Sequence, residues 1–455
     1  MAPLTFLTLR QSGIIGLAVS LFALPVLAED AGSPLILTLD KALAMASEQN
    51  RDILIADQDR NKADEQVSEA WAGVFPKITV NGLYSRYIEK PVLFIPANTP
   101  LLNPTNSTQK FSIGSDNAYS AGVNFSQTLF DRKVGVALNI ADTYHEYSQQ
   151  AYHSTEQDIA LAVKKAFYGV LLAQKLVEAN RQGLEVVKAN FENVQALYRH
   201  GNAAEYDLLR ANVQLANTEP LLISAENNLL LAKNVLKNLL AVPLSQDIEL
   251  VGELTFEELS GEAMAEADQK AIATNPAIAQ LALQESILEM NVSVEQSSYF
   301  PTLSIVGGYQ WQTQDNTFQF RNYLWANTFN VGLQLSYTLF DGLKSTSRVQ
   351  QASIERQKVH LVRLKSEEGL KIQIQSTELK MLEARKRIEG QEKNINQAQQ
   401  AVRIAQTRFK SGVGTQLELL DSQVAMTRAQ TNYAQALYDY IIAKAEWQRA
   451  VGLPK

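Results

Sequence analysis

The chain has 455 residues, contains no cysteine and carries a formal net charge of −7 at pH 7. The absence of cysteine excludes disulfides, thiolate metal sites, cysteine nucleophiles and a lipid attached to an N-terminal cysteine. The mildly acidic balance argues against nucleic acid as a partner. The length suits two or three ordinary domains or one duplicated unit.

The first 28 residues have the pattern of a secretory signal peptide. Arg10 supplies a basic region, residues 14–24 form an apolar stretch, and residues 25–28 end in a small residue suited to cleavage. A membrane anchor is the alternative, but the apolar run is short. No later segment approaches the ~20 apolar residues that a spanning helix needs. If the protein crosses a membrane, we therefore expect it to do so as a β-barrel.

The first half of the chain is predicted to alternate helices and strands around one long polar loop. In order, we expect a helix over residues 41–72, a strand over 78–85, a loop over 89–117, a strand over 119–129, a long helix ending at Gly201 and a return helix over 204–240. The loop prediction depends on four prolines among Asn, Ser and Thr.

The longest predicted element runs from residue 328 to residue 412. It begins with residues 328–339, where apolar and polar residues alternate as in a strand with one apolar face. From Leu343 onward the pattern becomes helical and stays free of proline until Pro454. A helix of about 70 residues would be about 105 Å long, which exceeds an ordinary globular domain.

This strand-to-helix pattern occurs twice, at a fixed separation. Apolar residues recur at spacings of seven, three and four, as in a coiled-coil seam. The two seams are Val177, Leu184, Val187, Phe191, Val194 and Tyr198, and Ile388, Ile395, Ala398, Val402, Ala405 and Phe409. Each residue of the first seam lies 211 positions before its counterpart, as Gly201 lies before Gly412. The chain is therefore read as an internal duplication.

The duplication defines the predicted domain boundaries. They are residues 1–28 as signal peptide, 29–243 as first repeat, 244–270 as connector and 271–455 as second repeat. A shorter loop over residues 312–326 replaces the loop over 89–117 in the second repeat. Strands would gather at one pole and helix turns at the other.

The predicted strands suit a membrane barrel shared by several chains. Four strands cannot close a barrel, since spanning barrels start at about eight. We expect Val123, Phe125, Leu333 and Leu335 to face lipid. Aromatic residues at the strand ends fit interfacial girdles: Tyr84, Tyr87, Tyr119, Tyr309, Trp311 and Trp325. The core of a soluble sandwich is the alternative for these aromatic residues. The spacing permits a dimer or a trimer.

These features resemble the outer membrane factor family, the TolC-like efflux and export channels. The duplication, the FP and TLFD strand borders, the long helices and the glycine turns carry the resemblance over the whole mature chain. It implies a mainly α, mixed α/β membrane protein that forms a homotrimer. Three chains would build a 12-stranded outer-membrane barrel, continued by a periplasmic α-helical barrel and belted at residues 244–270.

Acidic residues near the second turn are candidates for a pore constriction. Glu418 and Asp421 lie three apart on one helix face, and Asp207 takes the place of Glu418 in the first copy. Such acids could ring a pore and attract cations, or they could face solvent and favour a helix N-terminus. The resemblance places them at the gate. There, Arg210 could pair with Asp207 or with an acid of the adjacent helix.

The latch residues of the family are replaced in this chain. Phe409 stands where the family has a tyrosine, and Gly414 stands where it has an arginine. We therefore expect closure to depend on packing of Tyr198 and Phe409. The turns at Gly201, Asn202, Gly412 and Val413 are expected to receive the hairpin of a periplasmic adaptor, although both glycines could be simple helix caps.

The sequence predicts no enzyme, metal site or cofactor. The four histidines (His145, His153, His200 and His360) are scattered and are expected to be solvated. No phosphate loop, nucleophile elbow or dinucleotide fingerprint is found. The leading hypothesis is a passive exit duct that docks to an adaptor and to an inner-membrane pump of the RND, ABC or MFS class. A pore-less structural or adhesive coiled-coil protein and an uptake porin are the alternatives.

Overall fold

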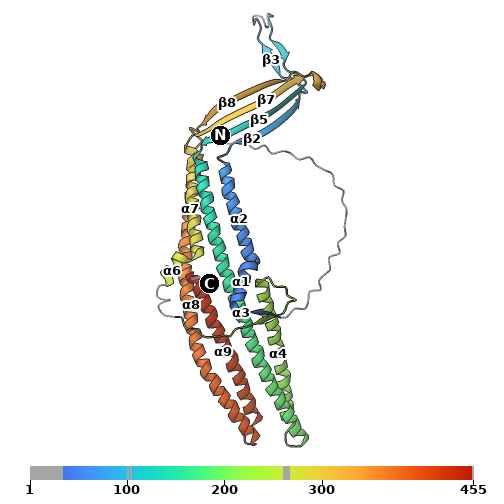
Figure 1. Cartoon of the computed structure of the whole chain (residues 1–455), viewed down its shortest axis with the longest axis vertical. Coiled ribbons are helices and arrows are strands. Elements are labelled where there is room, and N and C mark those ends of the chain that lie inside the picture. Colours follow the sequence, from blue (N-terminus) through green and yellow to red (C-terminus); the bar gives the residue numbers. More distant parts are fainter. Residues whose placement is uncertain (1–33, 100–101, 103–104, 260–266, 453–455) are drawn as a thin grey trace, which may run out of the picture.

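The chain forms one elongated molecule with a sheet at one end and helix turns at the other (Figure 1). The computed structural model describes residues 34–99, 102, 105–259 and 267–452. The predicted signal peptide and residues 260–266 of the predicted connector lie outside the described residues. The large sheet and the helix turns thus lie at opposite poles, as predicted, whereas the short strands at residues 35–37 and 248–250 pair with each other near the middle of the molecule.

Eight α-helices lie within the described residues. Their bounds are α1 Leu39–Gln49, α2 Arg51–Ala72, α3 Arg132–Arg199, α4 Glu205–Leu239, α6 Ala267–Thr274, α7 Pro276–Gln296, α8 Lys344–Lys410 and α9 Gln416–Val451. The long helices α3 and α8 have 68 and 67 residues, which confirms the predicted length of about 70. Seam residues such as Val194 and Ala405 are buried, because they face the neighbouring helices.

The predicted helix over residues 41–72 is interrupted at Asn50, which contradicts a single continuous element. Asn50 is extended, and its side-chain oxygen accepts from the N–H groups of Asp52 and Ile53, so it caps α2. Its Nδ2 also donates to Leu239 O at the end of α4, at 2.9 Å. The half-length helices α2 and α4 are thereby joined end to end beside α3 (Figure 1).

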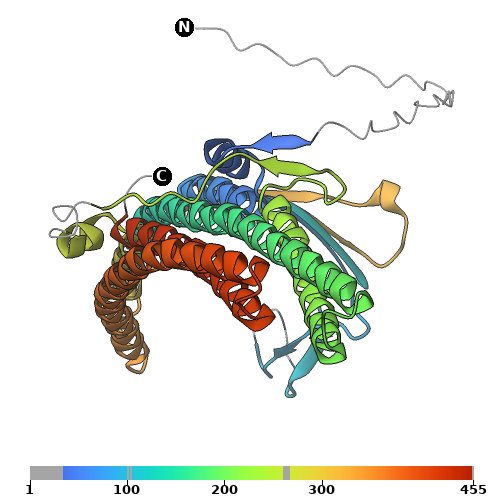
Figure 2. The same cartoon turned by 90° about the horizontal axis from the view of Figure 1, so that it is seen from below.

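The helices follow an arc when viewed along the molecule, and the arc has two free sides (Figure 2). Near the sheet their order is α2, α3, α7, α8, and toward the tips it is α4, α3, α9, α8. Helix α8 therefore forms one side over its full length, whereas α2 and α4 share the other. Both sides carry exposed apolar side chains, among them Leu361 and Leu379 on α8 and Leu209 and Val213 on α4.

The described strands form three sheets, of which one is large. Their bounds are β1 Leu35–Leu37, β2 Lys77–Arg86, β3 Val92–Ile95, β4 Gln109–Ser112, β5 Asn117–Phe130, β6 Ile248–Leu250, β7 Thr302–Asp315 and β8 Ala326–Ser336. The large sheet is antiparallel with the order β2, β5, β7, β8, so β2 and β8 are its edges.

Two strand predictions need correction. The predicted loop over residues 89–117 contains the β3–β4 hairpin, which projects beyond the large sheet (Figure 1). Both strands have four residues, and β3 sits between Pro91 and Pro96, so the turn signals concealed the hairpin. The last predicted strand, over residues 328–339, ends at Ser336. The period-two pattern continues to Leu339, but Gly342 and Leu343 turn the chain into α8 with positive φ angles.

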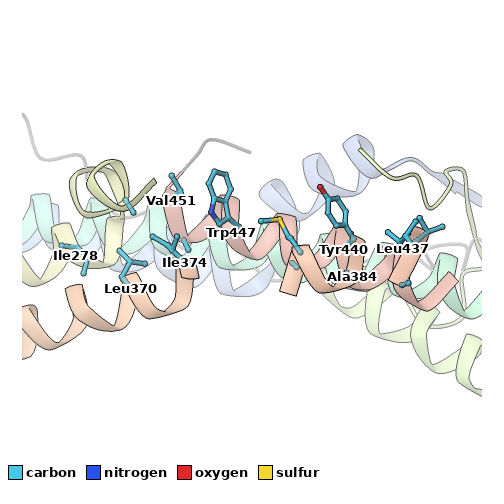
Figure 3. Close-up of a cluster of buried hydrophobic side chains, with 14 residues drawn as sticks. Ile278, Leu370, Ile374, Ala384, Leu437, Tyr440, Trp447 and Val451 are labelled. Carbon is cyan, nitrogen blue, oxygen red and sulfur yellow. The ribbon is translucent and has the colours of Figure 1, made fainter. Parts of the chain in front are cut away.

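Two buried clusters hold the helices together at mid-height. In the second half, α7, α8 and α9 enclose Trp447, Ile374 and Met381. Tyr440 and Leu437, which precede Trp447 on α9, extend the cluster toward the helix tips (Figure 3). The indole of Trp447 is fully buried, and its N–H donates to Glu378 at 3.2 Å. The first half has a matching cluster around Phe167 and Leu236. Throughout the described part of the chain, the helices lack the long uncharged apolar run that crossing a bilayer would require.

Candidate functional site: the apolar sheet face and the helix tips

The register of the large sheet places apolar residues on one face. Val80, Val123, Tyr309 and Phe329 pair directly across the four strands, so their side chains point to the same side. The next rows on this face hold Phe125 with Val331, and then Leu333 and Leu335. Leu333 and Leu335 are 71% and 69% exposed in the single chain. The four residues predicted to face lipid thus lie on one common face, where Leu333 and Leu335 are exposed and Val123 and Phe125 are half-buried.

The opposite face of the same sheet is polar. Thr79, Asn124, Gly308 and Asn330 form one cross-strand row, and Asn124 Nδ2 donates to Asn81 Oδ1 at 2.7 Å. A sheet with one apolar face and one polar face can separate an apolar medium from water. Its two edges, however, leave backbone N–H and C=O groups unpaired in the single chain.

Aromatic rings gather on the apolar face at the end of the sheet far from the helices. The Tyr84 and Tyr119 rings stack at 4.8 Å between centroids, and Phe320 and Tyr323 contact Tyr119 at 5.3 and 5.5 Å. The Tyr84 hydroxyl donates to Asn117 at 2.8 Å. Rings with an apolar body and a polar tip suit the boundary between lipid and water.

The first helix tip, between α3 and α4, is closed by a glycine cap. Gly201 has φ +73°, and its N–H donates to Tyr198 O at 2.9 Å. The N–H of Asn202 donates to Leu197 O at 2.8 Å, which completes a Schellman motif. An added Cβ at Gly201 would meet no atom within 4 Å, so only the backbone conformation requires glycine here.

The second tip, between α8 and α9, has the same cap, and the chain after the cap packs closely against Arg408. Gly412 has φ +71° and donates to Phe409 O at 3.1 Å, while Val413 N–H donates to Arg408 O at 3.1 Å. An added Cβ at Gly414 would lie 2.8 Å from the Arg408 Cβ and 3.0 Å from its carbonyl carbon. A side chain therefore does not fit at residue 414 in this turn.

A charged pair crosses the second tip. Arg408 Nε lies 3.5 Å from Glu418 Oε2, and the Thr415 hydroxyl accepts from the Glu418 N–H at 3.2 Å. Both charged side chains are about half exposed, at 52% and 48%, so the pair contributes about 0–1 kcal/mol. Sequence reasoning missed Arg408, although a basic residue in the last turn of a helix was the available signal.

The remaining predicted gate residues are divided between the two tips. Asp207 is half-buried in the first turn of α4, and Asp421 is exposed on α9, one turn after Glu418. Tyr198 is 40% exposed and Phe409 is half-buried. Arg210 forms no ion pair within the described residues, so the suggested pairing with Asp207 or a neighbouring acid is not found. Both tips lie at the same end of the molecule (Figure 1).

Three of the four histidines lie beside a carboxylate, and the side chains of His145, His153 and His360 remain 32%, 57% and 45% exposed, which agrees with the expectation that the histidines are solvated. His145 lies 2.9 Å from Asp64, His153 lies 3.2 Å from Glu156, and His360 lies 3.0 Å from Glu285. The partners of His145 and His360 come from helices far away in sequence, which periodicity within one helix cannot reveal. Within the described ranges, His, Asp and Glu side chains do not gather into a group of three that could hold a metal ion.

Comparison with known proteins agrees with this geometry. A family model described as "Outer membrane efflux protein" matches residues 42–242 and 268–453. Outer membrane protein TolC of Vibrio cholerae is 24% identical over 365 residues, which cover 78% of this chain and 83% of that protein. Alkaline protease secretion protein AprF of Pseudomonas aeruginosa is 24% identical over 345 residues, covering 74% and 70%.

A solved structure shows the same fold. The Campylobacter jejuni CmeC outer membrane channel superposes with a TM-score of 0.75 at 16% identity, covering 91% of this chain and 85% of that chain. The predicted TolC-like fold and the predicted outer-membrane localisation are thereby confirmed. The chain belongs to the outer membrane efflux protein family.

Proposed function

We propose that the protein is a passive exit duct of the outer membrane. Three copies would join their four-stranded sheets into a 12-stranded barrel in outer-membrane lipid. Their helices would continue the barrel into the periplasm, with residues 244–270 as a belt around its middle. Residues 29–243 and 271–455 would act as the two repeats of each copy.

The observation that carries this proposal is that the two edges of the large sheet and the two free sides of the helix arc lie on the same two sides of the chain. Strand β8 and helix α8 lie on one side of the chain, and β2, α2 and α4 lie on the other. Unpaired strand edges in lipid cost several kcal/mol per unsatisfied group, so the edges must meet those of other copies. A ring of copies closes the sheet and covers the exposed leucines of α8 and α4 in one step.

The helix tips are proposed as the gate and as the docking surface. Asp207, Glu418 and Asp421 would form acidic rings at the periplasmic mouth, where Tyr198 and Phe409 pack. The glycine turns at residues 201–202 and 412–413 would meet the hairpin of a periplasmic adaptor. The adaptor would link the duct to an inner-membrane pump of the RND, ABC or MFS class, which supplies the energy. The secretion role named for AprF supports export through such an assembly.

Fractionation and conductance test the proposal. We expect the protein in the outer-membrane fraction as a trimer, and we expect purified protein to open discrete conductance steps in a planar bilayer. Leu361→Asp tests the contact between copies. It places a charge on the free side of α8 and should therefore reduce trimer yield. A soluble periplasmic monomer without conductance would instead support a pore-less coiled-coil protein.

A further inference from the structure

A small pocket at mid-height contains two lysines. It lies between α3, α9 and the chain segment that follows β6, and its volume is about 190 Å³. Lys164 and Tyr168 line it from α3, and Lys444 and Gln448 line it from α9. The volume exceeds that of several water molecules, since each occupies about 30 Å³ in the liquid. A polyatomic ion therefore fits.

The Lys164 ammonium has no partner among the described residues. Lys164 is half-buried, and it makes no hydrogen bond or ion pair there. Burial and the nearby Lys444 ammonium both lower the pKa of Lys164. Charged groups removed from water are normally paired, so an unpaired lysine beside a second lysine marks a place where an anion would be stabilised.

The second lysine is held in place from the other side of the pocket. Lys444 Nζ lies 3.2 Å from the Glu257 carboxylate and donates to the Glu257 backbone oxygen at 3.3 Å. The segment is fixed further by the Tyr440 hydroxyl, which accepts from Leu259 N–H at 3.1 Å, and by a tilted ring contact of Phe256 with Tyr440 at 4.6 Å between centroids. Tyr440 projects from α9 in Figure 3. The pocket thus has ordered walls.

Apart from the Glu257 carboxylate, every hydrogen-bonding side chain that lines the pocket can donate. Besides the two lysines, the side chains of Tyr168, Thr255 and Gln448 line it, and they make no hydrogen bond to a described residue. Glu257 lines the pocket and pairs with Lys444, but its side chain is 77% exposed, and the other nearby carboxylate, Asp40, is also exposed. Water screens both carboxylates more than it screens Lys164.

We propose that Lys164 and Lys444, with Tyr168, Thr255 and Gln448, form a binding site for a small oxyanion of the size of phosphate. Two ammonium groups supply charge-assisted hydrogen bonds, and the neutral groups supply the remaining contacts. Lys164 lies about 50 Å along α3 from the apolar sheet, at 1.5 Å per residue. A lipid headgroup at the sheet cannot reach this depth, so the anion comes from solution. The proposal does not depend on the channel function.

Titration with inorganic phosphate tests the site. Full-length protein in detergent is titrated with phosphate at constant ionic strength, and ³¹P line broadening and heat release are followed. Lys164→Met should weaken binding about tenfold or more, because it removes a charge-assisted hydrogen bond. Lys164→Arg should retain most of the affinity. Glutarate, titrated in parallel, shows whether a carboxylate replaces phosphate.

Lys165→Met is the matched control. Lys165 is adjacent on α3, but its ammonium lies 2.6 Å from Glu446 and it does not line this pocket. The phosphate affinity of the Lys165→Met variant should equal that of the unmodified protein. Lys164→Met should fold normally, since it removes an unpaired charge, and its channel conductance should be unchanged. Equal phosphate binding by Lys164→Met, or absence of binding by the unmodified protein, overturns the site.

Discussion

Asn50 and Asn275 form the same joint in the two halves of the chain. Each caps the helix that follows it, and each donates its Nδ2 to the end of another helix. Asn50 Nδ2 lies 2.9 Å from Leu239 O, and Asn275 Nδ2 lies 3.1 Å from Ala450 O. Both asparagines are about 95% buried. One side chain therefore joins two half-length helices into a single rod beside each long helix.

Removing the amide donor should weaken the second joint. Asn275→Ala loses both the cap and the bond to Ala450, and we expect it to destabilise the protein by about 2–3 kcal/mol. Asn275→Asp keeps the capping oxygen but turns a carboxylate toward the Ala450 carbonyl. Hydrogen exchange in the last turn of α9 should rise in both variants. Exchange that rises only in Asn275→Ala would assign the effect to the cap alone.

Acidification should loosen the contact between α7 and α8 at Glu285. Burial raises the pKa of Glu285, but hydrogen bonds from Arg363 Nε at 2.9 Å and from His360 outweigh it, so the net pKa lies below 4.5. A lowered carboxylate pKa stabilises the folded state above the ordinary value, and this stability is lost as pH falls through the folded value. Local opening of α7, measured by hydrogen exchange, should therefore increase on the acid side of pH 4.5.

Glu285→Gln should remove this pH dependence. The Glu285 side chain is 23% exposed, so we expect a loss of about 1.5–3 kcal/mol near neutral pH that fades on acidification. Glu289→Gln serves as control, because Glu289 is 68% exposed and lies 3.7 Å from Arg356, which predicts a change of about 0–1 kcal/mol. Equal losses in both variants would show that burial at Glu285 is unimportant.

A charge on the apolar sheet face should prevent assembly. Val123→Arg and Leu333→Arg should each cost about 2–4 kcal/mol at mid-bilayer and reduce trimer yield in the outer membrane. Gln334→Arg is the control, since Gln334 is the neighbour of Leu333 on the polar face, opposite Ser304. Heat-modifiable trimer bands on gels measure the outcome. Normal yield for Leu333→Arg would contradict the assigned face.

The Arg408–Glu418 pair should tune ion selectivity at the helix tips. Glu418→Ala combined with Asp421→Ala should lower cation selectivity, because acidic rings attract cations. Arg408→Ala should raise it, since Glu418 then lacks its neutralising partner at 3.5 Å. Reversal potentials in a salt gradient measure both effects. If neither variant shifts the reversal potential, the acids face away from the pore.

The two glycines of the second tip should respond differently to a methyl group. Gly412→Ala adds strain of about 1–2 kcal/mol from its left-handed backbone, but no collision. Gly414→Ala forces Arg408 and its backbone away, so the turn itself must rearrange. Hydrogen exchange of residues 408–418 should rise more in Gly414→Ala. For the same reason, Gly414→Arg should disrupt the turn rather than add a functional latch.

The sequence predicted the repetitive parts of this protein well. Period two over residues 119–129 and the seam from Val177 to Tyr198 are local, repeated signals, and they gave the strands and long helices of the TolC-like fold. The break at Asn50 was missed because an asparagine in a polar helix is common. Its function appears only through Leu239, which lies 189 positions away.

The helix tips show where prediction from the sequence stops. The resemblance to the family, applied to Phe409 and Gly414, predicts that its latch residues are replaced in this chain. That Gly414 excludes a side chain depends on how closely the turn packs on Arg408, and residue spacing does not determine this distance. Likewise, the carboxylate partners of His145 and His360 come from other helices, so residue spacing along one helix could not predict these pairs.

The unbroken course of α8 has a mechanical consequence for a ring of copies. In the proposed ring, α8 of one copy, which has 67 residues, would lie along α2 and α4 of the next copy. This continuous helix would pack across the break between α2 and α4 at Asn50. A force that bends the helical barrel at this joint would then act on the continuous α8 of the neighbouring copy. The barrel would therefore stay stiff at the height where the end of α4 meets the start of α2.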